Sequence, residues 1–218
     1  QWIINNGTFD ASKEIPGEYA GYNCSLVFPS EMNNFTWYAN KKSVNLYAGN
    51  NITIDTNFDI DASAGLLLKA HNVTFSPSGT PLTIDIEEHG GDSDTLHIEA
   101  TGTVSCNNTY FKLEECGGKE LAANIEADGN IYMVNSDFLF ANETGDGSIQ
   151  FDVQSYGGIL DMTNAEVSTY KSSGNTDSEF HFSAYSNVAA INMNFDTEDF
   201  NIGTIESITG DIDISNAV

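Results

Sequence analysis

Apolar and polar residues alternate in short stretches along most of the chain, and the stretches recur in groups of three. The group at residues 96–113 reads LHIEATGTVSCNNTYFKL, with short polar corners between its alternating stretches. An alternation with a period of two places every second side chain on one face, so each stretch predicts a β-strand with one apolar face. One such group cannot bury that face alone, but stacked copies can. The pattern therefore predicts a parallel β-solenoid.

The three-strand group recurs from residue 44 to the C-terminus. We align the copies on the small residue that follows the first strand, at Ala48, Ala70, Ala100, Ala127, Val153 and Ala184. Length differences between copies collect in polar, glycine-rich stretches, as expected for loops that leave and rejoin a regular frame. We predict an all-β fold of about 7–9 coils over residues 44–218, with almost no helix.

Residues 1–43 are less regular than the rest of the chain. They contain two prolines and a dense set of aromatic residues. Proline is tolerated at bends and edges rather than in central strands. We predict an irregular coil or a side excursion, continuous with the solenoid. Its aromatic side chains have two open interpretations, packing on the solenoid or contact with a ligand.

The repeats resemble those of a known family. The phrase GNNITIDTNFDIDASAGLLLKAHNVTF at residues 49–75 is similar to the degenerate repeats of filamentous-haemagglutinin-like exoproteins, which are bacterial adhesins and contact-dependent toxins exported by two-partner secretion. The resemblance covers residues 44–218 and rests on the pattern, without an invariant motif. It implies a right-handed parallel β-helix that serves as a cell-surface stalk and carries binding patches.

The charge of the chain narrows the possible partners. The formal net charge is −25, from 32 acidic residues and 7 basic ones, and all the basic residues are lysines. Such a surface repels phosphate, which disfavours nucleic acid and anionic membranes as partners. No apolar run is long enough to span a bilayer, so we expect no membrane insertion. Because the last repeat is incomplete, we expect this chain to be a segment of a longer protein.

Several features suit an exported protein. Seven Asn-x-Ser/Thr sequons are present, slightly more than this composition gives by chance, and they predict a secreted or cell-surface location. The three cysteines show no Cys-x-x-Cys spacing and have too few nearby histidines for a zinc site. Cys106 and Cys116 fall in one repeat, so either a disulfide joins them or both are buried thiols.

Aligned repeats stack the outward residues of the first strand into two columns. One column is Tyr47, Lys69, Glu99, Glu126, Asp152 and Ser183, and the other is Asn45, Leu67, His97, Asn124, Gln150 and His181. The candidate binding residues are Tyr47, His97, Glu99, Asn124, Glu126, Asp152 and His181. Stacked carboxylates repel by about 1 kcal/mol per pair even in water, so Glu99, Glu126 and Asp152 either splay into solvent or bind calcium. We expect no other cofactor.

Catalytic signatures are incomplete. Asn175-Thr176-Asp177 resembles one element of the polygalacturonase signature, but the other elements are missing, and the chain has no arginine for pectate-lyase chemistry. Nucleophile elbows, metalloprotease motifs and phosphate loops are also missing. We predict a non-catalytic binding or stalk module of an adhesin, which contacts a glycan or protein on another cell. The alternative is a polysaccharide-active β-helix enzyme.

Overall fold

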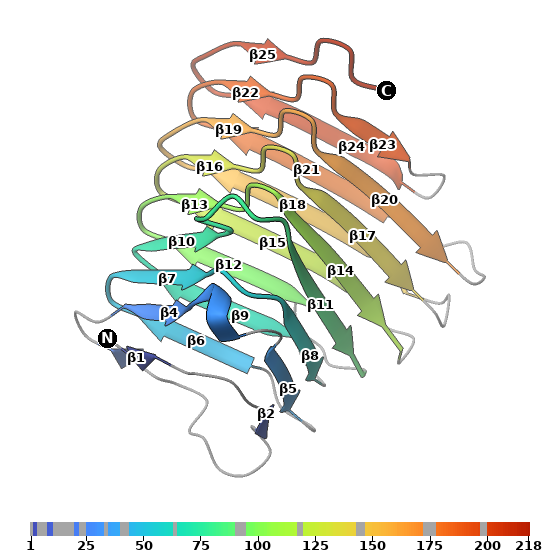
Figure 1. The fold of residues 1–218 in the computed structure, drawn as a ribbon. Helices are drawn as coiled ribbons and strands as arrows, with labels where there is room; N and C mark the ends of the chain where they lie inside the picture. The colour runs from blue at the N-terminus through green and yellow to red at the C-terminus, as the bar shows by residue number, and fades with distance from the viewer. Residues whose placement is uncertain are drawn as a thin grey trace.

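The chain folds into a three-sided β-solenoid (Figure 1). The structure is a computed structural model that describes residues 2–3, 8–10, 20–21, 25–32, 35–39, 44–62, 65–89, 95–116, 120–142, 147–171, 178–196 and 200–218. Each coil places one strand in each of three parallel sheets, and the coils wind in a right-handed sense (Figure 1). The only helical element among the described residues is the 3-10 turn Ser30–Met32, and none of their helices could cross a membrane. The predicted fold class is confirmed.

The three sheets, named A, B and C, run along the length of the solenoid. Sheet A contains β1 (Trp2–Ile3), β4 (Leu26–Phe28), β7 (Asn51–Ile54), β10 (Asn72–Phe75), β13 (Val104–Ser105), β16 (Ile131–Tyr132), β19 (Leu160–Asp161), β22 (Val188–Ala189) and β25 (Ile212–Asp213). Sheet B contains β2 (Thr8–Asp10), β5 (Phe35–Ala39), β8 (Phe58–Ala62), β11 (Leu82–Glu88), β14 (Thr109–Glu115), β17 (Asp137–Asn142), β20 (Glu166–Lys171) and β23 (Asn194–Asp196). Sheet C contains β3 (Ala20–Gly21), β6 (Val44–Ala48), β9 (Leu66–Ala70), β12 (Leu96–Ala100), β15 (Leu121–Ala127), β18 (Ile149–Ser155), β21 (Ser178–Ala184) and β24 (Phe200–Ser207). The strands of residues 1–43 thus belong to the same three sheets as the later repeats.

Inward side chains of all three sheets form one continuous core. In sheet A the in-register ladder is Leu26, Ile52, Val73, Val104, Ile131, Leu160 and Val188, all buried. Aromatic rings fill the space between sheets, and the rings of Phe111 and Phe138 stack with centroids 4.7 Å apart. Burying one such side chain contributes about 1.5–3 kcal/mol, so the stacked coils supply the stability that a single coil lacks.

Sequence alignment placed one repeat two residues out of register. The residue paired with Ala127 and Ala184 in sheet C is Ser155, whereas the sequence alignment placed Val153 there. A shift of two residues keeps every side chain on the same face of the strand, so the apolar pattern cannot detect it. The outward columns change accordingly, and Asp152 moves from the first column to the second.

Asparagines form a ladder at the corner between sheets A and B. Five of them adopt positive φ angles of 52–57°, namely Asn108, Asn135, Asn164, Asn192 and Asn216. In the last four, the side-chain amide donates to the side-chain oxygen of the asparagine one coil before it, at 2.9–3.3 Å. Asparagine tolerates the left-handed conformation better than other residues with a side chain, and the ladder satisfies its amide groups. The repeated asparagine therefore fixes the turn from sheet A to sheet B.

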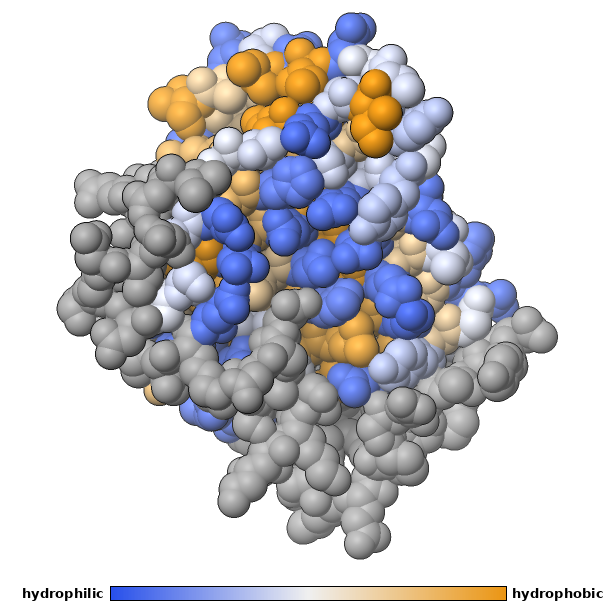
Figure 2. All heavy atoms as spheres, turned by 180° about the vertical axis from the view of Figure 1, so that it is seen from behind, coloured by the Kyte–Doolittle hydropathy of each residue, from blue (hydrophilic) through white to orange (hydrophobic). Residues whose placement is uncertain are grey.

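The last coil leaves apolar side chains exposed. Ile212 continues the ladder of sheet A beyond Val188, yet it is 45% exposed whereas Val188 is 1% exposed. Ile208 and Val218 are 71% and 88% exposed. Figure 2, which views the molecule from behind, shows hydrophobic atoms gathered at this end above a hydrophilic face.

Candidate functional site

The outer face of sheet C carries the predicted binding residues in two straight columns. In register, the first column is Tyr47, Lys69, Glu99, Glu126, Gln154, Ser183 and Glu206. The second is Asn45, Leu67, His97, Asn124, Asp152, His181 and Thr204. Neighbouring strands of a sheet lie about 4.8 Å apart, and the backbones of successive residues in one column are separated by this distance. The structure thus brings four candidates together in the second column, and Glu99 and Glu126 together in the first.

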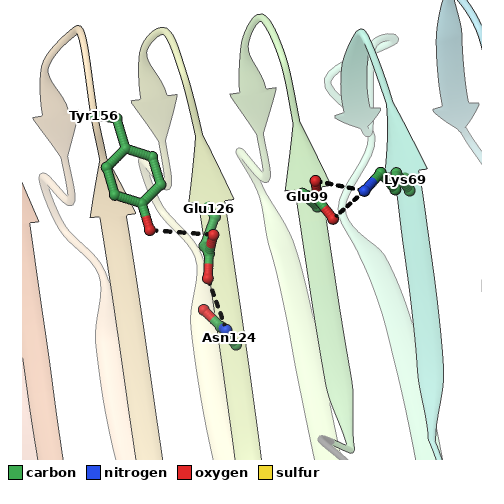
Figure 3. Close-up of polar contacts among 5 residues, drawn as sticks. All are labelled: Lys69, Glu99, Asn124, Glu126 and Tyr156. Carbon is green, nitrogen blue, oxygen red and sulfur yellow. Dashed lines mark hydrogen bonds and ion pairs between the residues drawn. The ribbon is translucent and has the colours of Figure 1, made fainter.

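The two adjacent glutamates have different partners (Figure 3). Lys69 Nζ lies 2.6 Å from both carboxylate oxygens of Glu99. Glu126 accepts hydrogen bonds from Asn124 Nδ2 at 2.9 Å and from the Tyr156 hydroxyl at 3.2 Å. These contacts relieve the repulsion expected between stacked carboxylates.

The predicted calcium column is wrong in one member. Asp152 pairs with Asn124 and His181 in the second column, so it does not continue the line of Glu99 and Glu126. In the first column, Glu99 and Glu126 are therefore the only adjacent carboxylates, and Glu99 forms an ion pair with Lys69. Calcium takes six to eight oxygen ligands, which this pair does not provide.

Two exposed tyrosines lie beside these columns, at the corner between sheets C and A. Tyr156 and Tyr185 are 52% and 46% exposed. Their backbone N–H groups donate to Ala127 and Ser155, which occupy equivalent positions on successive coils. The two rings therefore belong to one column that runs along the edge of sheet C.

Polar groups surround the tyrosine column. Burial is the main cause that raises the pKa of Tyr156, and the charge and hydrogen bond of Glu126 raise it further. Next to it, Gln154 Nε2 lies 3.4 Å from His181 Nδ1, and His181 Nε2 lies 3.8 Å from Glu206. The arrangement combines exposed aromatic rings with amide, imidazole and carboxylate groups, which suits an uncharged polar ligand.

No protein-family model, curated protein or solved structure matches the chain. The resemblance to filamentous-haemagglutinin-like exoproteins therefore stays a prediction, and so do the location and partners that it implies. The functional interpretation rests on the geometry of the solenoid surface.

Cys106 and Cys116 do not form a disulfide, which was one of the two alternatives that the sequence left open. Cys106 is fully buried at the corner before β14, whereas Cys116 follows the other end of this strand. A strand of seven residues is about 20 Å long, and a disulfide requires Cα atoms within about 7 Å. The third strand that the sequence predicts for this repeat therefore separates the two thiols.

Other predictions concern residues 1–43 and the loops. Phe28 is buried and its ring contacts that of Phe58 edge-on, with centroids 4.9 Å apart, so this aromatic residue packs on the solenoid. The sequon at Asn142 does not lie on the surface, because this side chain is buried and donates to the Gly147 carbonyl. Cys24 and Asn175-Thr176-Asp177 lie outside the described residues.

The tyrosine column was not predicted, because the alignment of β18 was wrong by two residues. Both tyrosines directly follow the small residue that ends a strand of sheet C, in the pairs Ser155-Tyr156 and Ala184-Tyr185. An alignment on Ser155 would have placed the two rings in one column. The small-residue and tyrosine pair was therefore the signal that identifies this part of the surface.

Proposed function

We propose that this chain is a non-catalytic, glycan-binding segment of a secreted or cell-surface exoprotein. The observation that carries the proposal is the pair of exposed tyrosines on successive coils, beside the polar columns of sheet C. In this proposal the solenoid is a stalk that holds the binding face rigid, as in the filamentous-haemagglutinin-like adhesins that the repeats resemble.

The chemistry of sugars matches this face. The C–H surface of a sugar ring packs on an aromatic ring, and its hydroxyl groups exchange hydrogen bonds with amides and carboxylates. The hydroxyl of Tyr156 donates to Glu126, which holds the ring at the edge of the sheet. A net charge of −25 opposes polyanionic glycans, so the proposed ligand is a neutral glycan.

Glycan arrays test the proposal. We expect the purified chain to bind neutral glycans, and the double substitution Tyr156→Ala and Tyr185→Ala to weaken binding about thirtyfold. This figure assumes about 1 kcal/mol for each aromatic contact. Tyr170→Ala is the matched control, because Tyr170 is 58% exposed on β20 of sheet B, away from the proposed face.

Two results would contradict the proposal. Binding that survives the double substitution would place the ligand elsewhere, and failure to bind any glycan would leave a stalk without this activity. A further experiment tests the enzyme alternative. Each glycan that binds is incubated with the chain, and the reducing ends released are measured. Release of reducing ends would support a polysaccharide-active enzyme instead of a binding module.

A further inference from the structure

A second group of functional side chains lies at the corner that follows sheet B. Its members are Asp61, Glu87, His89 and Cys116, contributed by three successive coils. Asp61 and Glu87 are paired in register on β8 and β11. The Cys116 N–H donates to the Glu88 carbonyl at 3.0 Å, which continues the pairing of β14 with β11 and places Cys116 beside His89.

The atoms of this group are separated like the ligands of one metal ion. Glu87 Oε1 lies 3.6 Å from His89 Nε2 and 3.6 Å from Cys116 Sγ. The three atoms all lie within 4.8 Å of one another. A tetrahedral zinc site with bonds of about 2.0–2.3 Å has neighbouring ligand atoms about 3.3–3.6 Å apart. Small rotations of the side chains would therefore bring the three atoms to one ion.

Asp61 is the candidate fourth ligand, although it lies outside the group of three residues whose ligand atoms are all within 4.8 Å of one another. Its Oδ1 lies 3.1 Å from His89 Nε2, on the coil before Glu87. Glu114, which is also in register with Glu87, is held by a different partner, because Lys112 Nζ lies 2.6 Å from its carboxylate. The cluster thus has two carboxylates, one imidazole and one thiol.

We propose that Asp61, Glu87, His89 and Cys116 form a zinc site that joins three coils. A thiolate and an imidazole favour zinc, whereas calcium takes oxygen ligands only. The side chains of Asp61, Glu87 and His89 are 40%, 45% and 44% exposed, so zinc enters from solvent without any rearrangement of the core. The site is independent of the glycan-binding face.

Sequence spacing gave no sign of this site, because His89 and Cys116 are far apart in the chain. The sequence showed no histidine near Cys116, whereas the fold brings His89 next to it. Two short sequence motifs indicate the site, Ile86-Glu-Glu-His89 and Leu113-Glu-Glu-Cys116, and they occupy equivalent positions on adjacent coils. Alignment of these motifs would have placed the histidine beside the cysteine.

Metal binding at this site releases protons. Zinc requires the thiolate of Cys116 and the neutral imidazole of His89, so the thiol proton leaves when the ion binds.

Titration with Co²⁺, a spectroscopic substitute for zinc, tests the site in the presence of a non-thiol reductant. The full chain should give a sulfur-to-cobalt charge-transfer band with one ion bound at saturation, and one equivalent of zinc should abolish the band. Cys116→Ser should remove the band, and His89→Gln should weaken binding at least tenfold. Glu114→Gln is the matched control and should bind as the unsubstituted chain does.

Thermal unfolding supplies a second readout that does not depend on the thiol absorption. Zinc should raise the melting temperature of the unsubstituted chain and of Glu114→Gln, and at the same concentration should raise that of His89→Gln less. Circular dichroism of each variant checks that it is folded. The proposal is overturned if Co²⁺ gives no thiolate band, or if folded Cys116→Ser and His89→Gln keep their zinc affinity.

Discussion

At the scale of single residues, two cysteines of one repeat differ because they lie at opposite ends of a strand. Cys106 is fully buried, and burial raises the pKa of its thiol. Cys116 is half-buried at the corner after β14, where its thiol contacts Glu87. A thiol reacts as its thiolate, so a buried thiol with a raised pKa is inert. The alternating pattern could place Cys106 inside, but it could not show the partners of Cys116.

Alkylation distinguishes the two thiols. We expect iodoacetamide to modify Cys116 of the folded chain much faster than Cys106, because the Cys106 thiol is inaccessible and protonated. Mass spectrometry of the peptides that contain each cysteine measures the two rates. In urea the two rates should become similar, whereas similar rates in the folded chain would contradict the burial of Cys106.

At the scale of elements, the sequence predicted the strands well and their register less well. Every second residue of β12 is buried, as its alternation predicted, and the same holds in β11 and β14. The position of β18 relative to its neighbours was wrong by two residues, because Val153 and Ser155 point to the same side of the strand. Burial therefore follows from the pattern, whereas side-chain partners depend on a register that the pattern leaves open.

Corners between strands have their own sequence requirement. Asn164 has a φ of 57°, and its side chain is hydrogen-bonded to Asn135 and to Asn192. The left-handed conformation costs most residues about 1–2 kcal/mol, but costs glycine little. The contributions of backbone conformation and of side-chain hydrogen bonds to stability can therefore be measured separately at Asn164.

Substitution of Asn164 measures the two contributions. Asn164→Ala should destabilise the chain by about 2 kcal/mol, since it adds backbone strain and removes two hydrogen bonds. Asn164→Gly should cost about 1 kcal/mol, because only the hydrogen bonds are lost. The midpoints of urea denaturation give both values. Equal destabilisation by alanine and glycine would show that the left-handed turn contributes nothing.

At the scale of the whole molecule, the acidic surface makes stability depend on pH. Burial is the main cause that raises the pKa of Asp85, with Lys112 opposing it, and burial followed by the charge of Glu166 raises the pKa of Asp137. Hydrogen bonds from Ser215 lower the pKa of Asp213. At pH values above 3.8, the usual pKa of aspartate, the folded chain therefore binds protons at Asp85 and Asp137 more readily than the unfolded chain.

The melting temperature should rise as the pH falls from 7 toward about 4. The stabilisation from Asp85 and Asp137 is complete below pH 3.8. It is lost as the pH rises through the pKa values of these two carboxyls in the folded chain. Asp213 opposes this trend only at pH values below 3.8, where protonation of its carboxylate lowers the stability of the folded chain. Calorimetry across this range tests the slope, and Asp137→Asn should flatten it. A melting temperature that falls steadily from pH 7 to 4 would contradict the prediction.

The direction of the hydrogen bonds between coils has a mechanical consequence. In a solenoid of parallel strands these bonds point along the long axis, so tension applied to the two ends acts on one coil boundary at a time. A chain anchored at one end and pulled at the other would lengthen in steps, each releasing a single turn while the remaining turns stay folded. Such stepwise extension absorbs sudden pulls without loss of the whole rod.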